Sequence, residues 1–249
     1  MNLFGLIGFP LTHSFSKKYF SKKFETLGLS ESHKYELFEI ESASEFPTLF
    51  EKHPNLKGIN ITIPHKQSVF DYLDGLDISA EKVGAVNVVK KTADNNLIGY
   101  NSDYYGFQKS LLEFLGERFE VKNLKALILG YGGAAKAVVA ALEDLGVSVQ
   151  LVSRKSSDIA VNYSESDSLI KTHKLIINCS PLGTYPNTNA FPSIDYTQLG
   201  REHFLFDLVY NPSETVFLRK GKEHGASIKN GYDMLVYQAE KSWEIWQES

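Results

Sequence analysis

Apolar and polar positions form two kinds of pattern along the 249-residue chain. Short runs rich in β-branched and aromatic residues alternate with longer segments whose apolar positions recur every three to four residues. The strand-like runs are residues 2–8, 34–40, 56–63, 84–91, 96–103, 124–130, 148–153, 174–179 and 203–210. The helix-like segments are residues 14–29, 44–52, 65–74, 104–116, 134–146 and 233–249. Strands that alternate with helices predict an α/β protein with mainly parallel sheets.

The pattern restarts near residue 104, which suggests two lobes. In the first lobe, residues 84–91 and 96–103 are predicted to form a hairpin around Asp94, Asn95 and Asn96. In the second lobe, residues 124–130 are almost entirely apolar, which is typical of a strand buried on both faces.

Composition narrows the class of protein. Hydrophobic residues make up 43% of the chain, charged residues 22%, and the formal net charge is −4, so a general nucleic-acid surface is not expected. Cys179 is the single cysteine and cannot form an internal disulfide, which fits a reducing compartment. Residues 1–13 lack a basic start, and no apolar stretch approaches the length of a membrane span. We therefore expect a cytoplasmic protein without nucleic-acid or membrane partners.

The second lobe carries a cofactor signal. Gly130, Gly132 and Ala135 have the G-x-G-x-x-A spacing, directly after a predicted buried strand and directly before a predicted helix. The first glycine permits a tight turn, the second lets a pyrophosphate approach the backbone, and the third small residue lets helix and strand pack closely. The alternative is a glycine-rich turn without a ligand, which this strand and helix context disfavours.

The next strand indicates which dinucleotide binds. A site for NAD usually has an acidic residue at the end of this strand, where it accepts from the ribose 2′-hydroxyl. Here the strand ends in Ser153, Arg154 and Lys155, and no acid follows until Asp158. Because Arg and Lys attract a 2′-phosphate that a carboxylate would repel, we expect NADP. The alternative is an exposed basic turn without a ligand.

Polar residues interrupt or follow several predicted strands of the first lobe. In open parallel sheets, ligands lie at the carboxyl ends of the strands. Hydroxyl, amide, ammonium and carboxylate groups suit a polyhydroxylated anionic small molecule. Each residue could instead be a helix cap or a turn former, and no spacing indicates a metal site. These residues are Ser14, Ser16, Thr62, Lys66, Asn87, Asn101 and Asp103.

The chain resembles the shikimate dehydrogenase family over nearly its whole length. The resemblance rests on an ordered series of motifs: GLIGFPLTHSFS, GINITIPHK, GAVNVV, GYNSDYYG, GYGGAAKA, SRK, NCSPLG, DLVYNPSETVFL and NGYDMLVYQAEKSWEIW. It implies an NADP-dependent enzyme that interconverts 3-dehydroshikimate and shikimate in chorismate and aromatic amino-acid biosynthesis.

The resemblance also implies a role for each matching residue. Lys66 and Asp103 would be the catalytic pair at the reacting oxygen. The substrate-binding residues would be Ser14 and Ser16 at the carboxylate, and Thr62, Asn87, Tyr210 and Gln238 around the ring. The cofactor-binding residues would be Gly130, Gly132, Gly133, Ala134, Ser153, Arg154, Lys155, Gly231 and Met234.

The fold that follows has two lobes with a cleft between them. Residues 1–103 and 230–249 would form a discontinuous α/β substrate-binding domain, and residues 104–229 a Rossmann-type NADP-binding domain. A monomer or a homodimer would fit. Two alternatives stay open: a quinate/shikimate dehydrogenase of broader specificity, and a non-catalytic NADP-binding sensor. It also stays open whether Lys66 is the general acid or an electrostatic anchor.

Overall fold

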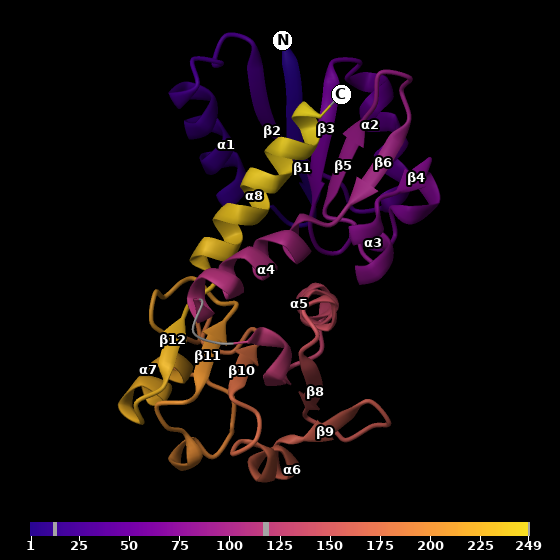
Figure 1. Ribbon diagram of the computed structural model, residues 1–249. Helices are drawn as coiled ribbons and strands as arrows, with labels where there is room; N and C mark the ends of the chain where they lie inside the picture. The colour runs from indigo at the N-terminus through magenta and orange to yellow at the C-terminus, as the bar shows by residue number, and fades with distance from the viewer. Residues whose placement is uncertain (12–13, 117–119, 249) are drawn as a thin grey trace. The chain divides into compact units, whose positions relative to one another are not determined.

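A computed structural model describes residues 1–11, 14–116 and 120–248 of the chain (Figure 1). Contacts between residues divide it into two compact units. Unit 1 comprises Met1–Ser102 and Ala239–Ser249, and unit 2 comprises Asp103–Gln238. The second boundary falls inside the last helix, whereas the sequence analysis placed a boundary at residue 230. None of the described helices combines the length and apolarity that crossing a bilayer requires.

Unit 1 contains a mixed six-stranded sheet in the order β2-β1-β3-β5-β6-β4. Strand β1 pairs in parallel with β2 and β3, whereas β5 is antiparallel to β3 and β6. The predicted hairpin is confirmed as β5 and β6, and Asn95 in its turn has a φ of 67°. The strands are β1 (Asn2–Gly8), β2 (His33–Glu39), β3 (Leu56–Ile61), β4 (Gly75–Leu76), β5 (Val88–Lys91) and β6 (Leu97–Tyr100).

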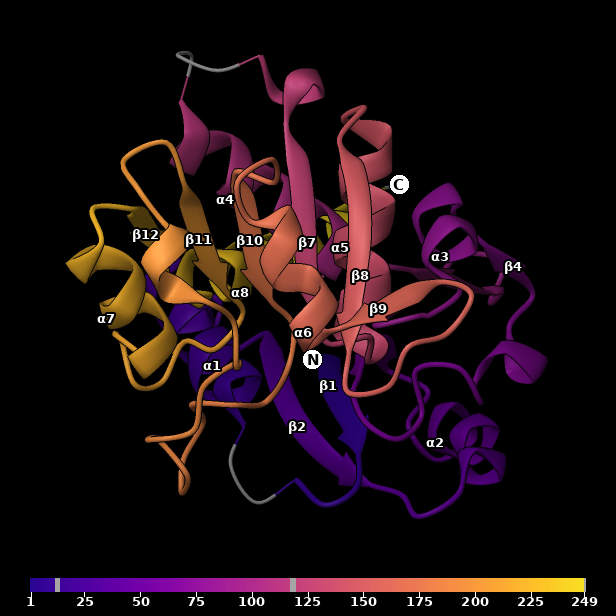
Figure 2. The same cartoon turned by 90° about the horizontal axis from the view of Figure 1, so that it is seen from below.

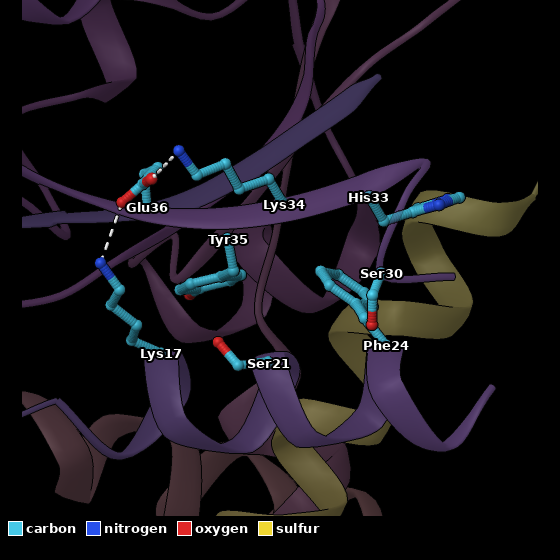
Figure 3. A pocket seen from close by; sticks show the side chains of 8 residues that line it. All are labelled: Lys17, Ser21, Phe24, Ser30, His33, Lys34, Tyr35 and Glu36. Carbon is cyan, nitrogen blue, oxygen red and sulfur yellow. Dashed lines mark hydrogen bonds and ion pairs between the residues drawn. The ribbon is translucent and has the colours of Figure 1, made fainter. Parts of the chain in front are cut away.

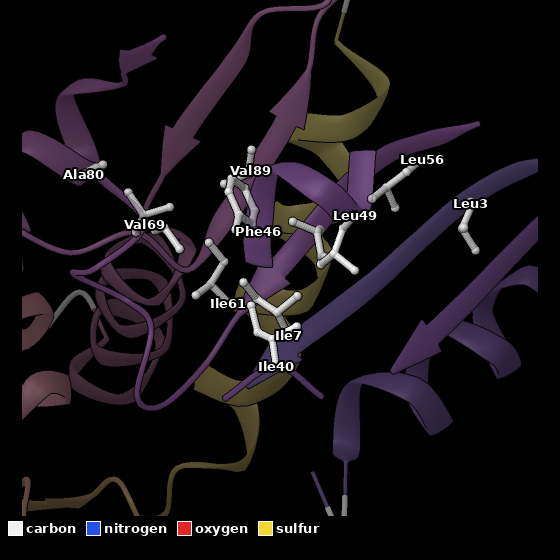
Figure 4. Packing of buried hydrophobic residues seen from close by; sticks show 12 residues of the cluster. Leu3, Ile7, Ile40, Phe46, Leu49, Leu56, Ile61, Val69, Ala80 and Val89 are labelled. Carbon is white, nitrogen blue, oxygen red and sulfur yellow. The ribbon is translucent and has the colours of Figure 1, made fainter. Parts of the chain in front are cut away.

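Both faces of this sheet are covered, because β1 sends alternate side chains to opposite sides. Leu3 and Ile7 join a cluster with Phe46 and Leu49 of helix α2 (Figure 4). Phe4 and Leu6 join a second cluster that includes aromatic residues of α1 and of the part of α8 in unit 1. The helices that begin in unit 1 are α1 (Phe15–Thr26), α2 (Phe46–Lys52), α3 (Ile78–Val83) and α4 (Ser102–Leu115).

The helix predicted for residues 65–74 is wrong. The segment consists of turns followed by a 3₁₀ helix, η2 (Phe70–Tyr72). In an α-helix the carbonyl of Lys66 would accept from the amide of residue 70. That carbonyl instead accepts from the amide of Val86 at 2.8 Å, and the amide of Phe70 turns to Gln67. Tertiary hydrogen bonding has therefore replaced the helical ladder here.

Unit 2 contains an all-parallel six-stranded sheet in the order β12-β11-β10-β7-β8-β9 (Figure 2). Numbered within the unit, this is 6-5-4-1-2-3, the strand order of dinucleotide-binding Rossmann folds. The predicted Rossmann-type fold is confirmed. The strands are β7 (Lys125–Leu129), β8 (Ser148–Ser153), β9 (Ala160–Asn162), β10 (Leu175–Asn178), β11 (Phe204–Asp207) and β12 (Ser227–Lys229).

The remaining helices are α5 (Gly133–Asp144), α6 (Tyr163–Ser166), α7 (Val216–Glu223) and α8 (Tyr232–Gln247). The periodicity missed six short elements of two to eight residues, which repeat a pattern at most about twice. The missed elements are β4, β9, β12, α3, α6 and α7.

Candidate active site

The glycine-rich turn of unit 2 lies where the sheet reverses direction. β7 and β10 are neighbours in the sheet, and the chain leaves them toward opposite edges, which makes this the switch point at which Rossmann folds bind ligands. Gly130 follows β7 with a φ of 97°, a conformation that favours glycine. A Cβ at Gly130 would lie 3.1 Å from the Cβ of Ser180, which follows β10. The two loops therefore approach closely at this position.

The N-terminus of α5 has the properties of a pyrophosphate site. No side chain caps it, and its first turn contains no acidic residue. A Cβ added at Gly132 or Gly133 would meet no atom within 4 Å, so there is room for a ligand against the backbone. Ala135 is fully buried, as the third small position of the motif requires. Exposed amides and the positive end of a helix dipole thus fit a dinucleotide's phosphates.

The loop after β8 begins with two positive charges, and its acidic residue, Asp158, comes only later. Arg154 and Lys155 are exposed, and neither forms an ion pair with any residue that the structure describes. Ser153 donates a hydrogen bond to the carbonyl of Lys155, which closes the loop. Glu165 is occupied elsewhere, since it accepts from the amide of Asn162 at 2.7 Å. The residues present fit an adenosine ribose that carries a 2′-phosphate.

A buried carboxyl group braces the loops after β10 and β11. Asp207 accepts hydrogen bonds from Asn178 Nδ2 at 2.9 Å, the amide of Val209 at 3.0 Å and Thr215 Oγ1 at 2.6 Å. Asn178 Oδ1 in turn accepts from the amide of Ser180 at 3.0 Å. Burial raises the pKa of Asp207 to about 6, although its three donors favour the charged form. This group holds the loop that contacts Gly130.

Four further predicted residues lie in the second half of unit 2. Gly231 is required by packing, because a Cβ there would lie 2.2 Å from the carbonyl oxygen of Leu208. Met234 and Gln238 lie on α8 and are both 8% exposed, and Gln238 Nε2 donates to a backbone carbonyl three residues earlier at 2.9 Å. Tyr210 follows β11 and is 43% exposed.

The predicted catalytic aspartate lies in the first turn of α4. Asp103 is the acidic residue of that turn, at the positive end of the helix dipole. The same helix packs closely on α8, since a Cβ at Gly106 would lie 2.7 Å from the carbonyl oxygen of Met234. Tyr104 donates to Asp144, and burial together with this carboxylate raises the pKa of Tyr104 to about 12. Within unit 2, Asp103 therefore begins a helix that is fixed against the segment carrying Met234.

In unit 1, the two predicted carboxylate-binding serines lie at the start of α1. Ser14 is the N-cap, and its Oγ accepts from the backbone amide three residues later at 3.2 Å. Ser16 forms a hydrogen bond with the hydroxyl of Tyr35, whose pKa is raised by burial. The capping alternative is therefore correct for Ser14, whose hydroxyl hydrogen still can be donated to a ligand. Thr12 and His13, from the same motif, lie outside the described residues.

Thr62 and Lys66 follow the carboxyl end of β3. The amide of Thr62 donates to the carbonyl of Ile7 at 2.9 Å, which ties the loop to the end of β1. Next to the half-buried Lys66, the ring of His65 is 2% exposed and bonds through Nε2 to the carbonyl of Ile40 at 2.7 Å. Together with the hydrogen bond from the amide of Val86 to the carbonyl of Lys66, these contacts anchor the backbone around the Lys66 side chain.

Asn87 immediately precedes β5, and its side-chain amide forms two hydrogen bonds with Ser102. Asn87 Oδ1 accepts from the amide of Ser102 at 2.7 Å, and Nδ2 donates to Ser102 Oγ at 3.0 Å. Both residues are buried. The neighbouring Asn101 is engaged in the fold, since its Nδ2 donates to the carbonyl of Ala85 at 2.8 Å. Only a three-dimensional structure could reveal this pairing across the hairpin.

The residues that link these groups were not predicted from the sequence. Asn60 Oδ1 accepts from the hydroxyl of Tyr35 at 2.7 Å, and Nδ2 donates to Ser242 Oγ at 3.0 Å and to the carbonyl of Asn87 at 3.3 Å. Ser242 Oγ lies 3.1 Å from Ser102 Oγ. The available signal was a lone amide between two apolar residues of a buried strand, because a buried amide needs hydrogen-bond partners.

Contacts within each unit thus gather the predicted residues at the carboxyl ends of parallel strands. In unit 1, backbone or side-chain hydrogen bonds connect the segments that carry Ser16, Thr62, Lys66 and Asn87. In unit 2, the glycine turn and the basic loop follow the adjacent strands β7 and β8. The chemical role of each residue stays a prediction.

Comparisons with known proteins agree with this geometry. The family model for the shikimate dehydrogenase substrate binding domain matches residues 6–89. A curated relative from Clostridium beijerinckii, named shikimate dehydrogenase (NADP(+)), is 40% identical over 261 residues, which cover 100% of this chain and 93% of the relative.

Solved structures extend the comparison to the fold. Shikimate 5-dehydrogenase from Thermus thermophilus, in complex with NADP(H) and shikimate, aligns with a TM-score of 0.85 and 28% identity, covering 99% of this chain and 94% of that one. Quinate dehydrogenase from Corynebacterium glutamicum, in complex with NAD, aligns with a TM-score of 0.88 and 25% identity, covering 99% and 93%.

Proposed function

The chain belongs to the shikimate dehydrogenase family, and on that premise we propose that it reduces 3-dehydroshikimate reversibly to shikimate with NADPH. The observation that carries the proposal is the end-to-end relationship to an NADP(+) shikimate dehydrogenase at 40% identity. In a cell this step would serve chorismate and aromatic amino-acid biosynthesis in the cytoplasm, with the enzyme acting as a monomer or a homodimer.

We propose that unit 2 binds the cofactor. The exposed amides at Gly132, Gly133 and Ala134 would hold the pyrophosphate, since no side chain among the described residues caps this helix end. Arg154 and Lys155, with Ser153, would hold the 2′-phosphate. Gly231 and Met234 would lie near the nicotinamide, which supplies the hydride for the reaction when NADPH is bound.

We propose that unit 1 recognises the substrate. Ser14 and Ser16 would donate hydrogen bonds to its carboxylate. Thr62 and Asn87 would bind ring hydroxyls, together with Gln238 and Tyr210. The hydrogen bonds of Ser16 and Asn87 to buried neighbours would hold their side chains in one orientation, which lowers the entropy cost of binding.

The proposed chemistry depends on charge that develops on the ketone oxygen. Hydride addition to the carbonyl carbon makes this oxygen negative, and a proton must then reach it to give the alcohol. The ammonium of Lys66 would stabilise that charge more strongly in the transition state than in the ground state. The carboxylate of Asp103 would fix the ammonium and share its protons. Both an acid role and a purely electrostatic role of Lys66 are compatible with this proposal.

The first experiment replaces the lysine. Lys66→Ala should lower kcat by roughly 10²- to 10⁴-fold, the usual span for a positioned acid or base. Lys52→Ala is the matched control, because it removes an exposed ammonium of unit 1 that no proposed role involves. Near-normal kcat in Lys66→Ala would remove this residue from the mechanism.

The second experiment separates the alternatives. Reduction of NADP and of NAD is followed spectrophotometrically with shikimate and with quinate as the substrate. We expect turnover with shikimate and NADP to be the fastest of the four reactions. Comparable turnover of quinate would favour the broader quinate/shikimate dehydrogenase, and no turnover of any pair would favour the NADP-binding sensor. Arg154→Gln should raise the KM for NADP about tenfold or more and leave that for NAD nearly unchanged.

A further inference from the structure

Two cavities of similar volume in unit 1 are lined by lysines. The first, of about 280 Å³, lies between α1 and β2 (Figure 3). Its lysines are partly neutralised from within the protein, because Lys34 and Lys17 both contact the single carboxylate of Glu36, at 2.6 and 2.9 Å. These contacts hold the pKa of Glu36 below its usual range. A single positive charge in excess therefore remains in this cavity, and both of its lysines already have a carboxylate partner.

The second cavity, of about 300 Å³, contrasts with it. Its lining includes Lys57 of β3 and Lys90 and Lys91 of β5. The antiparallel register that pairs Gly58 with Lys90 places Lys57 opposite Lys91, and like charges in that relation destabilise a sheet. Within the described part of the chain, none of the three ammonium groups pairs with a carboxylate.

Lys90 is the most informative of the three. It is only 8% exposed, and its Nζ donates to the backbone carbonyl of Glu248 at 2.7 Å. An ammonium has three donors, and a buried charge is costly without a counter-charge. The carboxylate of Glu248 lies 4.0 Å from Lys241 and pairs with that lysine. The protein therefore holds a positive charge in the cavity wall without supplying its counter-ion from the described residues.

Apart from Glu248, whose carboxylate pairs with Lys241, the rest of the lining suits a small organic or inorganic anion. Phe4 and Trp246 form an aromatic wall, with ring centroids 4.8 Å apart, and Asn2 and Thr92 add polar groups. The cavity lies where strands β1 and β3 begin, whereas Thr62 lies at the other end of β3, where that strand ends. We propose that it binds a small polyanion with phosphate or carboxylate groups, which the three lysines hold.

The test measures binding to the full-length chain by isothermal titration calorimetry. Pyrophosphate is one probe and citrate the other, each added with NADP at saturation so that the dinucleotide site is occupied. We expect one site per chain. The double variant Lys57→Gln/Lys91→Gln should weaken binding about tenfold or more, since each ammonium contributes a charge-assisted contact. Lys90→Met should weaken it at least as much. Lys52→Gln is the matched control and should change affinity less than about twofold.

Each outcome of the titration either supports the proposed anion site or overturns it. Binding of either probe with loss in the double variant supports the site, and the tighter probe identifies phosphate or carboxylate as the preferred group. A second measurement localises it: in Trp243→Phe, the fluorescence of Trp246 should change as the probe binds. The proposal is overturned by absence of binding, by several equivalent weak sites, or by equal affinity in the double variant and the control. Because no turnover is measured, such a result leaves the proposed dehydrogenase activity untouched.

Discussion

Replacement of the buried carboxyl at Asp207 by an amide should change how the stability of unit 2 depends on pH. Asp207 has no solvent exposure and accepts three hydrogen bonds, from Asn178, Val209 and Thr215. In Asp207→Asn, the amide oxygen can still accept from Asn178 and Val209, and the amide nitrogen can donate to Thr215 Oγ1. The variant thus keeps the shape and the number of contacts but cannot ionise.

The magnitude follows from the two pKa values. The carboxyl has an ordinary pKa of 3.8, and burial raises it to about 6 in the folded chain. Between these values the folded chain binds more protons than the unfolded chain, so the free energy of unfolding falls as pH rises. At about 1.4 kcal/mol for each pH unit that separates the two values, the whole loss is about 3 kcal/mol, of which about 2 kcal/mol falls between pH 4 and pH 7. Asp207→Asn should lack this loss.

Urea unfolding of both proteins, followed by circular dichroism at pH 4.0, 5.0, 6.0 and 7.5, measures the effect. The stability of the variant relative to the wild-type protein should rise by about 2 kcal/mol from pH 4.0 to 7.5. The comparison cancels the pH dependence of other groups, and carbon NMR of the labelled carboxyl gives the pKa directly. A stability difference that is equal at all four pH values, or a carboxyl that titrates at 4 or below, would refute the reasoning.

Two further substitutions test the packing of unit 1. Gly58→Ala places a Cβ 2.2 Å from the indole Nε1 of Trp246, whose N–H donates to a β5 carbonyl. This variant should lower the free energy of unfolding in urea by about 1–3 kcal/mol or more. Gly75→Ala, whose Cβ meets only a flexible methyl group at 3.2 Å, is the control, and equal losses in the two variants would contradict the prediction. Tyr35→Phe leaves Asn60 without its donor and should cost about 1–3 kcal/mol, so an unchanged urea midpoint would show that this hydrogen bond contributes nothing.

The sequence was informative where the chemistry is local. The continuous apolar run before Gly130 and the small-residue spacing after it are properties of one βα turn, so they predicted that strand, turn and helix. The absence of an acid at the end of β8 is equally local. The resemblance then extended these expectations to residues far apart in the chain, such as Ser14 and Gln238.

Local patterns failed where distant segments compete for the same backbone groups. Residues 65–74 have helical periodicity, yet Val86 occupies the carbonyl of Lys66 and the segment folds as turns. The short strands β9 and β12 exist because longer parallel neighbours supply their hydrogen-bond partners. Such pairings carry no signature in the paired segments themselves.

The sequence by itself therefore determined which elements could form and which side chains could carry chemistry, because periodicity, turn residues and functional groups are properties of nearby positions. Tertiary structure decided which buried polar groups meet. Asn60, in the middle of a strand, contacts Tyr35 from another strand and Ser242 from the last helix. A buried amide must find partners wherever the fold brings them, and that choice is made only when the whole unit has packed.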